Sequence, residues 1–222
     1  PYLPDEDEPT KGSDDKDIPD NYITVTFKSE DATKGTVKVG TKTGAEVRAK
    51  VKPGTNLVGK AEAVAEKGYG FTKWEPELGV AADKAVYTAK FIKDGSEVGK
   101  DDPIPEGWFR VTVKQDATSI AKSTVEEKTY AVAPKDEAKG QTGKLAADKF
   151  PSLKDKEAQG YENPAWYKDA DKTATANPSD VEITADTTFT AKATLKPEYT
   201  GDDVIPYLPD EDEPTKGSDD KD

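Results

Sequence analysis

The sequence predicts an α+β protein with two small domains in tandem, each a mostly β sheet with one helix. Short segments alternate apolar and polar residues between glycines, which is typical of half-buried strands. One segment in each half changes to the spacing of an amphipathic helix. Related segments also recur in the same order in both halves, which predicts two copies of one fold.

The first domain, residues 19–93, is expected to consist mainly of strands. Ile23, Val25 and Phe27 occupy alternate positions, so they are expected to share the buried face of the first strand. Glycines separate the strands that follow. The alternation predicts strands at 22–28, 35–40, 45–53, 71–74 and 84–93.

A helix is expected at residues 56–68, NLVGKAEAVAEKG. Thr55 or Asn56 can cap its beginning, and Gly68 can end it. The residues expected on its apolar face are Leu57, Ala61, Val64 and Ala65.

The second domain, residues 105–196, repeats this plan with longer loops. A short helix is expected at 142–150, TGKLAADKF, capped by Thr142 and ended by Pro151. Strands are expected at 108–114 and 124–134, and a final hairpin or bent strand at 181–196. The paired segments are IPDNYITVTFK (18–28) with IPEGWFRVTVK (104–114), GYGFTKW (68–74) with GYENPAW (160–166), and VYTAKF (86–91) with TFTAKA (188–193).

The chain begins and ends with the same seventeen residues, PYLPDEDEPTKGSDDKD, at 1–17 and 206–222. Each copy carries seven acids and two lysines, so the two copies supply −10 of the net charge of −13. We therefore expect acidic, proline-containing linkers at 1–18 and 197–222, and a shorter linker at 94–104. The repetition predicts that the chain is one period of a tandem array with the start of the next period attached.

The chain contains no cysteine, histidine or methionine. It therefore has no thiol nucleophile, no disulfide, no thiolate or imidazole zinc ligand and no Ser–His–Asp triad. Its negative charge disfavours nucleic acid and anionic membranes as partners, and no apolar run is long enough to span a membrane. We expect no catalytic, cofactor-binding or metal residues, and a protein that is not an enzyme.

Two segments carry a resemblance to a known family. Gly68, Tyr69, Phe71 and Trp74 match a Gly-Tyr-x-Phe-x-Gly-Trp motif, with Lys73 in place of its second glycine. The second domain matches this motif at Gly160, Tyr161 and Trp166, and matches the family's last strand at Ile183, Thr184, Asp186, Thr187, Thr188 and Ala191. The chain thus resembles the Listeria–Bacteroides repeat, or internalin B-repeat, over about half of each domain.

This resemblance implies β-grasp-like domains in a cell-wall-anchored, tandem-repeat surface protein of a Gram-positive bacterium. The implied localisation is extracellular, at the bacterial cell surface, with attachment through regions outside this chain. The expected partners are adjacent identical repeats in the same chain, with a host extracellular protein or glycan as a further possible partner.

Some residues could form binding sites. One is a binding platform formed by aromatic residues, namely Trp74, Trp166, Tyr69 and Tyr161. A core role is favoured for them, because aromatic side chains bury large areas and these domains have few aliphatic residues. The acidic clusters lack the spacing of a calcium-binding loop, so we expect weak Ca²⁺ binding at most. Exposed aromatics are expected only at Tyr2, Tyr199 and Tyr207.

Three functions fit the sequence. The favoured one is a stalk that projects a terminal domain of a surface adhesin from the cell wall, because proline and like charges stiffen a spacer. The alternatives are binding of a host matrix, mucin or plasma ligand by many weak contacts, and cell–cell association in a biofilm.

Overall fold

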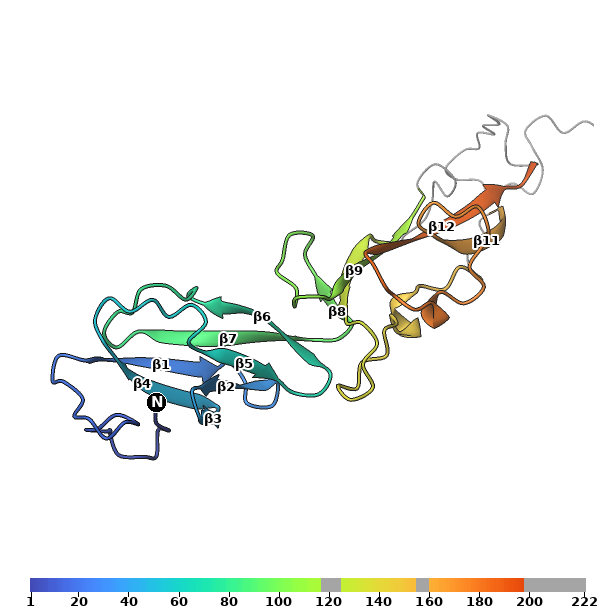
Figure 1. Ribbon diagram of the computed structural model, residues 1–222. Coiled ribbons are helices and arrows are strands. Elements are labelled where there is room, and N and C mark those ends of the chain that lie inside the picture. Colours follow the sequence, from blue (N-terminus) through green and yellow to red (C-terminus); the bar gives the residue numbers. More distant parts are fainter. Residues whose placement is uncertain (117–124, 155–159, 198–222) are drawn as a thin grey trace, which may run out of the picture.

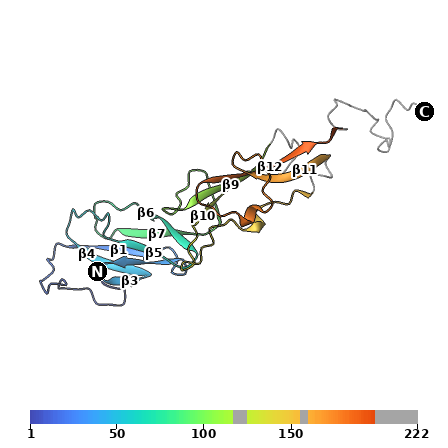
Figure 2. The same cartoon turned by 45° about the vertical axis from the view of Figure 1, so that its right-hand side comes forward.

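The computed structural model describes residues 1–116, 125–154 and 160–197 (Figure 1). No helix of seven or more residues occurs within these ranges. The helical elements described are two short 3₁₀ turns, η1 (Ala147–Lys149) and η2 (Pro178–Asp180). The predicted α+β class, two β-grasp-like domains with one helix each, is therefore wrong. The chain instead forms two strand-built domains, arranged end to end (Figures 1 and 2).

The strands of these ranges form three sheets, with the orders β4-β1-β7-β6, β3-β2-β5 and β11-β12-β9-β10-β8. The strands are β1 (Ile23–Ser29), β2 (Gly35–Val39), β3 (Lys42–Gly44), β4 (Glu46–Val51), β5 (Glu62–Ala65), β6 (Tyr69–Glu75), β7 (Val86–Lys93), β8 (Ser96–Val98), β9 (Phe109–Gln115), β10 (Lys128–Val132), β11 (Tyr161–Lys168) and β12 (Thr187–Leu195).

The core of the first domain lies between its two sheets. Val25 and Phe27 of β1 enter it from the four-stranded sheet, as their alternation predicts, and Val37 of β2 enters it from the three-stranded sheet. β1 lies at the centre, antiparallel to β4 and parallel to β7.

The helix predicted at 56–68 is absent, and an edge strand occupies part of its place. β5 pairs antiparallel with β2, which has no other strand on that side. Gly59, with φ of +72°, breaks a helical path in the middle of the segment. The sequence AEAVA also alternates, so its alanines face the core while Glu62 and Val64 face outward. Pairing with β2 thus stabilises this segment as a strand in place of the predicted helix.

The helix predicted at 142–150 is reduced to the turn η1. Gly143 is left-handed and Ala146 is extended, so a helix cannot continue through them. The Thr142 hydroxyl donates to the Lys144 carbonyl, at 3.5 Å, in place of a helix cap. Leu145 is buried against the sheet, which explains why the segment follows the core surface.

Four strands of each domain share order and register, since β4-β1-β7-β6 corresponds to β10-β9-β12-β11. Phe27 lies opposite Tyr87 in the parallel pair of the first domain, and Val113 lies opposite Phe189 in the second. These pairs occupy equivalent places in the repeated segments, so the internal sequence repeat corresponds to a repeat in structure.

The connection between the domains is part of the second sheet. Residues 94–104, assigned to a linker from the sequence, contain β8, which pairs antiparallel with β10. The Asp94 carboxylate accepts the Ala133 N–H at 2.9 Å, and Gly95 N–H donates to the Ala131 carbonyl at 2.9 Å. β7 therefore continues through a two-residue turn into the second domain.

Candidate functional site

Three basic side chains lie along the outer edge of β4 and the start of β3 in the first domain, and Glu46 of β4 pairs with one of them, Arg48, at 2.9 Å. The alternation of β4 directs Arg48 and Lys50 away from the core, and Lys42 begins the neighbouring strand β3. We call the surface formed by these three residues the junction groove. Residues 1–8, the first part of the acidic sequence that occurs twice, contact these residues, and the N-terminus lies beside β4 (Figure 1).

Tyr2 attaches this segment to the sheet. Its N–H donates to the Arg48 carbonyl at 2.8 Å, and the Arg48 N–H donates to the Tyr2 carbonyl at 2.9 Å. The Tyr2 side chain is only 6% exposed. The prediction that Tyr2 is an exposed linker aromatic is therefore wrong, whereas Tyr199 and Tyr207 lie outside the described residues. Residue 2 covers the β4 edge, whose backbone groups would otherwise be open to another strand.

Two glycines leave room for the segment. A Cβ at Gly44 would lie 3.2 Å from the Leu3 side chain, and one at Gly40 would lie 3.4 Å from the Pro1 ring. Leu3 packs against the core of the first domain. The β2–β3 turn and β3 thus receive the apolar part of the segment.

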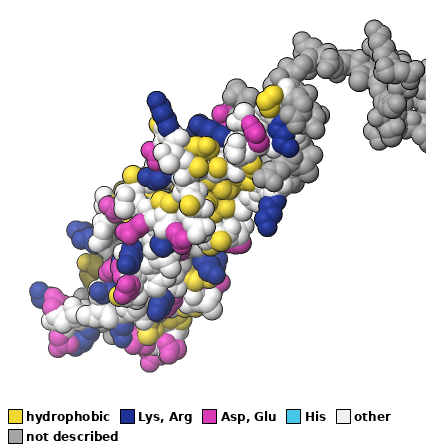
Figure 3. All heavy atoms as spheres, turned by 90° about the vertical axis from the view of Figure 1, so that its right-hand side faces the viewer, with side chains coloured by type: hydrophobic (Ala, Val, Ile, Leu, Met, Phe, Trp, Pro, Cys, Tyr) yellow, Lys and Arg dark blue, Asp and Glu magenta, His cyan; other side chains and the backbone are white. Residues whose placement is uncertain are grey.

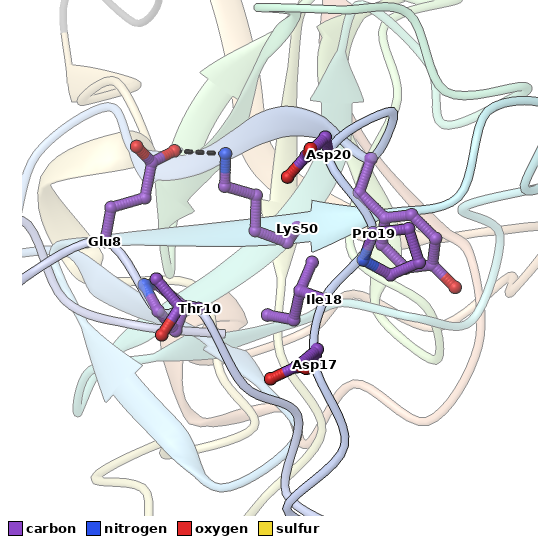
Figure 4. A pocket seen from close by; sticks show the side chains of 9 residues that line it. Glu8, Thr10, Asp17, Ile18, Pro19, Asp20 and Lys50 are labelled. Atoms are coloured by element: carbon purple, nitrogen blue, oxygen red, sulfur yellow. Dashed lines mark ion pairs between the residues drawn. The ribbon is translucent and has the colours of Figure 1, made fainter.

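The acidic part of the segment pairs with the groove lysines. Glu6 forms an ion pair with Lys42, and Glu8 forms one with Lys50 (Figure 4). The Thr24 hydroxyl also donates to Glu8, at 3.3 Å. The hydrogen bond from Lys42 lowers the pKa of Glu6 below its ordinary value of 4.5, and the bond from Lys50 does the same for the pKa of Glu8. Both glutamates therefore bind as carboxylates.

A hollow of about 470 Å³ lies where the segment turns back toward β1 (Figure 4). Glu8, Thr10, Asp17 and Asp20 line it, with the Lys50 side chain between them. An ammonium group there competes with any bound cation. In the ranges that the structure describes, no group of three or more acidic side chains is placed to hold a metal ion. The described copy of the acidic linker therefore shows no ligand set for even a weak Ca²⁺ site.

A second candidate is a cleft of about 650 Å³ between the domains. Phe71 of β6 and Trp108, just before β9, contribute apolar walls, and the edge strand β5 borders it. The backbones approach closely beside it, because Gly68 N–H donates to the Lys139 carbonyl at 2.9 Å. The cleft thus lies beside a direct contact between the two domains.

The aromatic residues considered for a platform belong mainly to the cores. Trp166 and Tyr161 are 7% and 4% exposed, and Trp74 contacts Phe27 edge-on with ring centroids 5.8 Å apart. The core prediction is confirmed for these three, whereas Tyr69 lines the cleft. Figure 3 shows one face of the molecule, on which apolar side chains gather in one area with lysines and acids scattered around them.

The docked segment was missed in the sequence, although a signal was present. Glu6 and Glu8 belong to an acidic run, and the basic residues Lys42, Arg48 and Lys50 lie in the segments that form β3 and β4. Tyr2 and Leu3 are apolar residues next to this acidic run. An acidic segment with that pattern can bind a basic strand edge.

Comparison with protein-family models, curated proteins and solved structures finds no match for the chain. The resemblance to the Listeria–Bacteroides repeat therefore stays a prediction. In the described part of the chain, no helix has the length and apolar character needed to cross a membrane.

Proposed function

We propose that the chain is a tension-resisting stalk segment of a tandem-repeat surface adhesin, and that it projects a terminal domain from a bacterial cell wall. The observation that carries this proposal is the position of the first and last long strands of each domain. In both domains these strands are parallel neighbours inside the sheet, β1 with β7 and β9 with β12.

Parallel pairing sets how the domain responds to tension along the chain. The beginning of β1 and the end of β7 lie at opposite ends of the pair, so pulling on them slides one strand along the other. The hydrogen bonds that join Thr26–Ser29 of β1 to Val86–Ala89 of β7 are then loaded at the same time and do not open one after another. Such an arrangement suits a protein held under tension.

The domain connection supports the same proposal. A flexible linker would let the domains swing independently, but here β8 and the hydrogen bonds of Asp94 attach the connection to the second sheet. This attachment would therefore keep the distance between the ends of each repeat constant even when no tension is applied. A surface location accords with this role and with the absence of cysteine.

The pulling geometry can be tested directly, because the chain has no native cysteine and two introduced cysteines give unique handles. Asp20→Cys with Lys93→Cys pulls the β1–β7 pair in shear. Ala32→Cys with Lys93→Cys pulls the same pair apart from one end. We expect a clearly higher unfolding force for the first pair in single-molecule measurements. Equal forces for the two pairs contradict the proposed function.

A second candidate function is binding of an extended host peptide at the interdomain cleft. The feature that favours it is β5, an edge strand beside the apolar Phe71 and Trp108, because exposed edges can accept a peptide strand. Repetition would add avidity to weak single contacts. Binding of matrix proteins, mucins or plasma proteins to the full chain, and its loss on Val64→Pro in β5, would support this candidate.

A further inference from the structure

The chain contains one described junction groove but two copies of the sequence that fills it. Residues 1–8 occupy the groove, and residues 206–213 have the same sequence. We propose that the junction groove is a specific receptor for this sequence and accepts it from a second copy of the chain, which produces head-to-tail association. This inference does not depend on the stalk function.

The contacts that hold residues 1–8 require only features that both copies possess. The backbone of Tyr2 pairs with Arg48, Leu3 fits against Gly44, and the carboxylates pair with the lysines. The corresponding residues of the second copy are Tyr207, Leu208, Glu211 and Glu213. A free second copy therefore carries the complete set of groups that the groove binds.

The recognition is more specific than attraction between opposite charges. The two hydrogen bonds between Tyr2 and Arg48 fix the position of the segment along β4, and the buried Tyr2 ring requires an aromatic at that position. Glu6 and Glu8 then fall opposite different lysines. A sequence with the same charge in another order cannot make this set of contacts.

The second copy cannot return to the groove of its own chain. β7 and β12 lie roughly end to end between the groove and the end of the described chain (Figures 1 and 2). At about 3.3 Å per residue, their combined length is about 55 Å. The nine residues 197–205 that precede the second copy span at most roughly 30 Å. A vacant groove must therefore take the segment from another molecule.

Residues 1–8 of the same chain compete for the junction groove more effectively than residues 206–213 of another chain. Residues 1–8 are tethered to β1 through a short hairpin, in which Gly12 N–H donates to the Lys16 carbonyl at 2.7 Å and Ile18 N–H donates to the Thr10 carbonyl at 2.8 Å. Such a tether gives the first copy a high effective concentration. Exchange between molecules is therefore expected when the first copy is removed or weakened.

The test uses the full chain with matched substitutions in either copy. Tyr2→Ala, Leu3→Ala and Glu8→Lys weaken the first copy, and Tyr207→Ala, Leu208→Ala and Glu213→Lys make the same changes in the second. Light scattering after size-exclusion chromatography gives the mass over a range of concentrations. We expect the first variant to exceed the monomer mass of 24.0 kDa as its concentration rises, and the second to stay monomeric.

A peptide with the sequence of residues 1–17 should dissociate the first variant, and a scrambled peptide of the same composition should not. Adding Lys42→Glu to the first variant should weaken association about tenfold or more, because it places like charges together where Lys42 pairs with the glutamate of the docked segment. Circular dichroism checks that each variant is folded. The proposal is overturned if the folded first variant stays monomeric, if both variants associate alike, or if the scrambled peptide competes equally.

Discussion

Gly70 has no side chain and so allows the two domains to pack closely at this point. An alanine Cβ at this position of β6 would lie 2.5 Å from Pro105 Cγ and 2.6 Å from Trp108 Cζ2. Carbon atoms that are not bonded prefer a separation of about 3.5–4.0 Å. Gly70→Ala therefore requires the second domain to move by roughly 1 Å or more at this contact.

The cost should fall on the domain contact and leave both cores intact. Pro105 and Trp108 precede β9, outside the core of the second domain. Forcing a methyl group into a packed contact costs about 1–3 kcal/mol, and rotation of one domain against the other relieves it. Gly70 itself does not have a positive φ, so the strand tolerates alanine.

Small-angle scattering combined with tryptophan fluorescence measures this effect. We expect Gly70→Ala to change the scattering profile toward a more flexible pair of domains, and to shift the emission of Trp108 toward that of an exposed indole. Gly79→Ala is the matched control, because a Cβ there meets nothing within 4 Å. If both variants scatter and fluoresce like the parent, the domain contact at Gly70 does not fix the arrangement.

Four further results are expected. Phe189→Ala should destabilise the second domain by about 3–5 kcal/mol in urea titrations, because this ring is fully buried at the core centre; a loss below about 1 kcal/mol would contradict that packing. Asp94→Ala should destabilise the domain connection by about 1–3 kcal/mol because it leaves a backbone N–H without its acceptor. Asp94→Asn should match or exceed parental stability at neutral pH in the same thermal melts, since burial raises the pKa of Asp94. The pKa values of Glu6 and Glu8 lie below 4.5, so docking of residues 1–8 should be complete above that pH and be lost as pH falls through the lowered values; an NMR titration that shows constant docking down to pH 2 would refute this.

The strands with a clear apolar face were predictable because that face lies against a core, whereas β3, β5, β8 and β11 were not predicted. Ile23–Ser29 and Phe109–Gln115 show the alternation in their residues, and both form central strands. The relation between the halves was also readable, since residues in paired segments occupy the same register positions.

The two helices were predicted wrongly, because the residues alone do not show that a strand edge is available for pairing. Ala61 and Ala65 fit both a helix face, with Leu57 and Val64, and a strand face, with Ala63. The free edge of β2 decides between them, and that edge comes from long-range folding. The docked segment was missed for a similar reason, because its acids suggest solvent exposure until the lysines of β3 and β4 lie opposite.

The parallel pairing of β1 with β7 also has a consequence for folding of the chain during its synthesis. The central pair joins the first and last long strands of the domain, so it cannot form until residue 93 has been made. Such distant pairing folds slowly and leaves strand edges exposed meanwhile. In a tandem array, an unpaired β1 could pair with the β7 of another identical copy. Such misassembly between domains is a known failure of repeat proteins. In such an array, a second domain with different core residues, Val113 for Phe27 and Ala193 for Phe91, would separate one identical copy from the next. Neighbouring strands would then not be interchangeable while the chain folds.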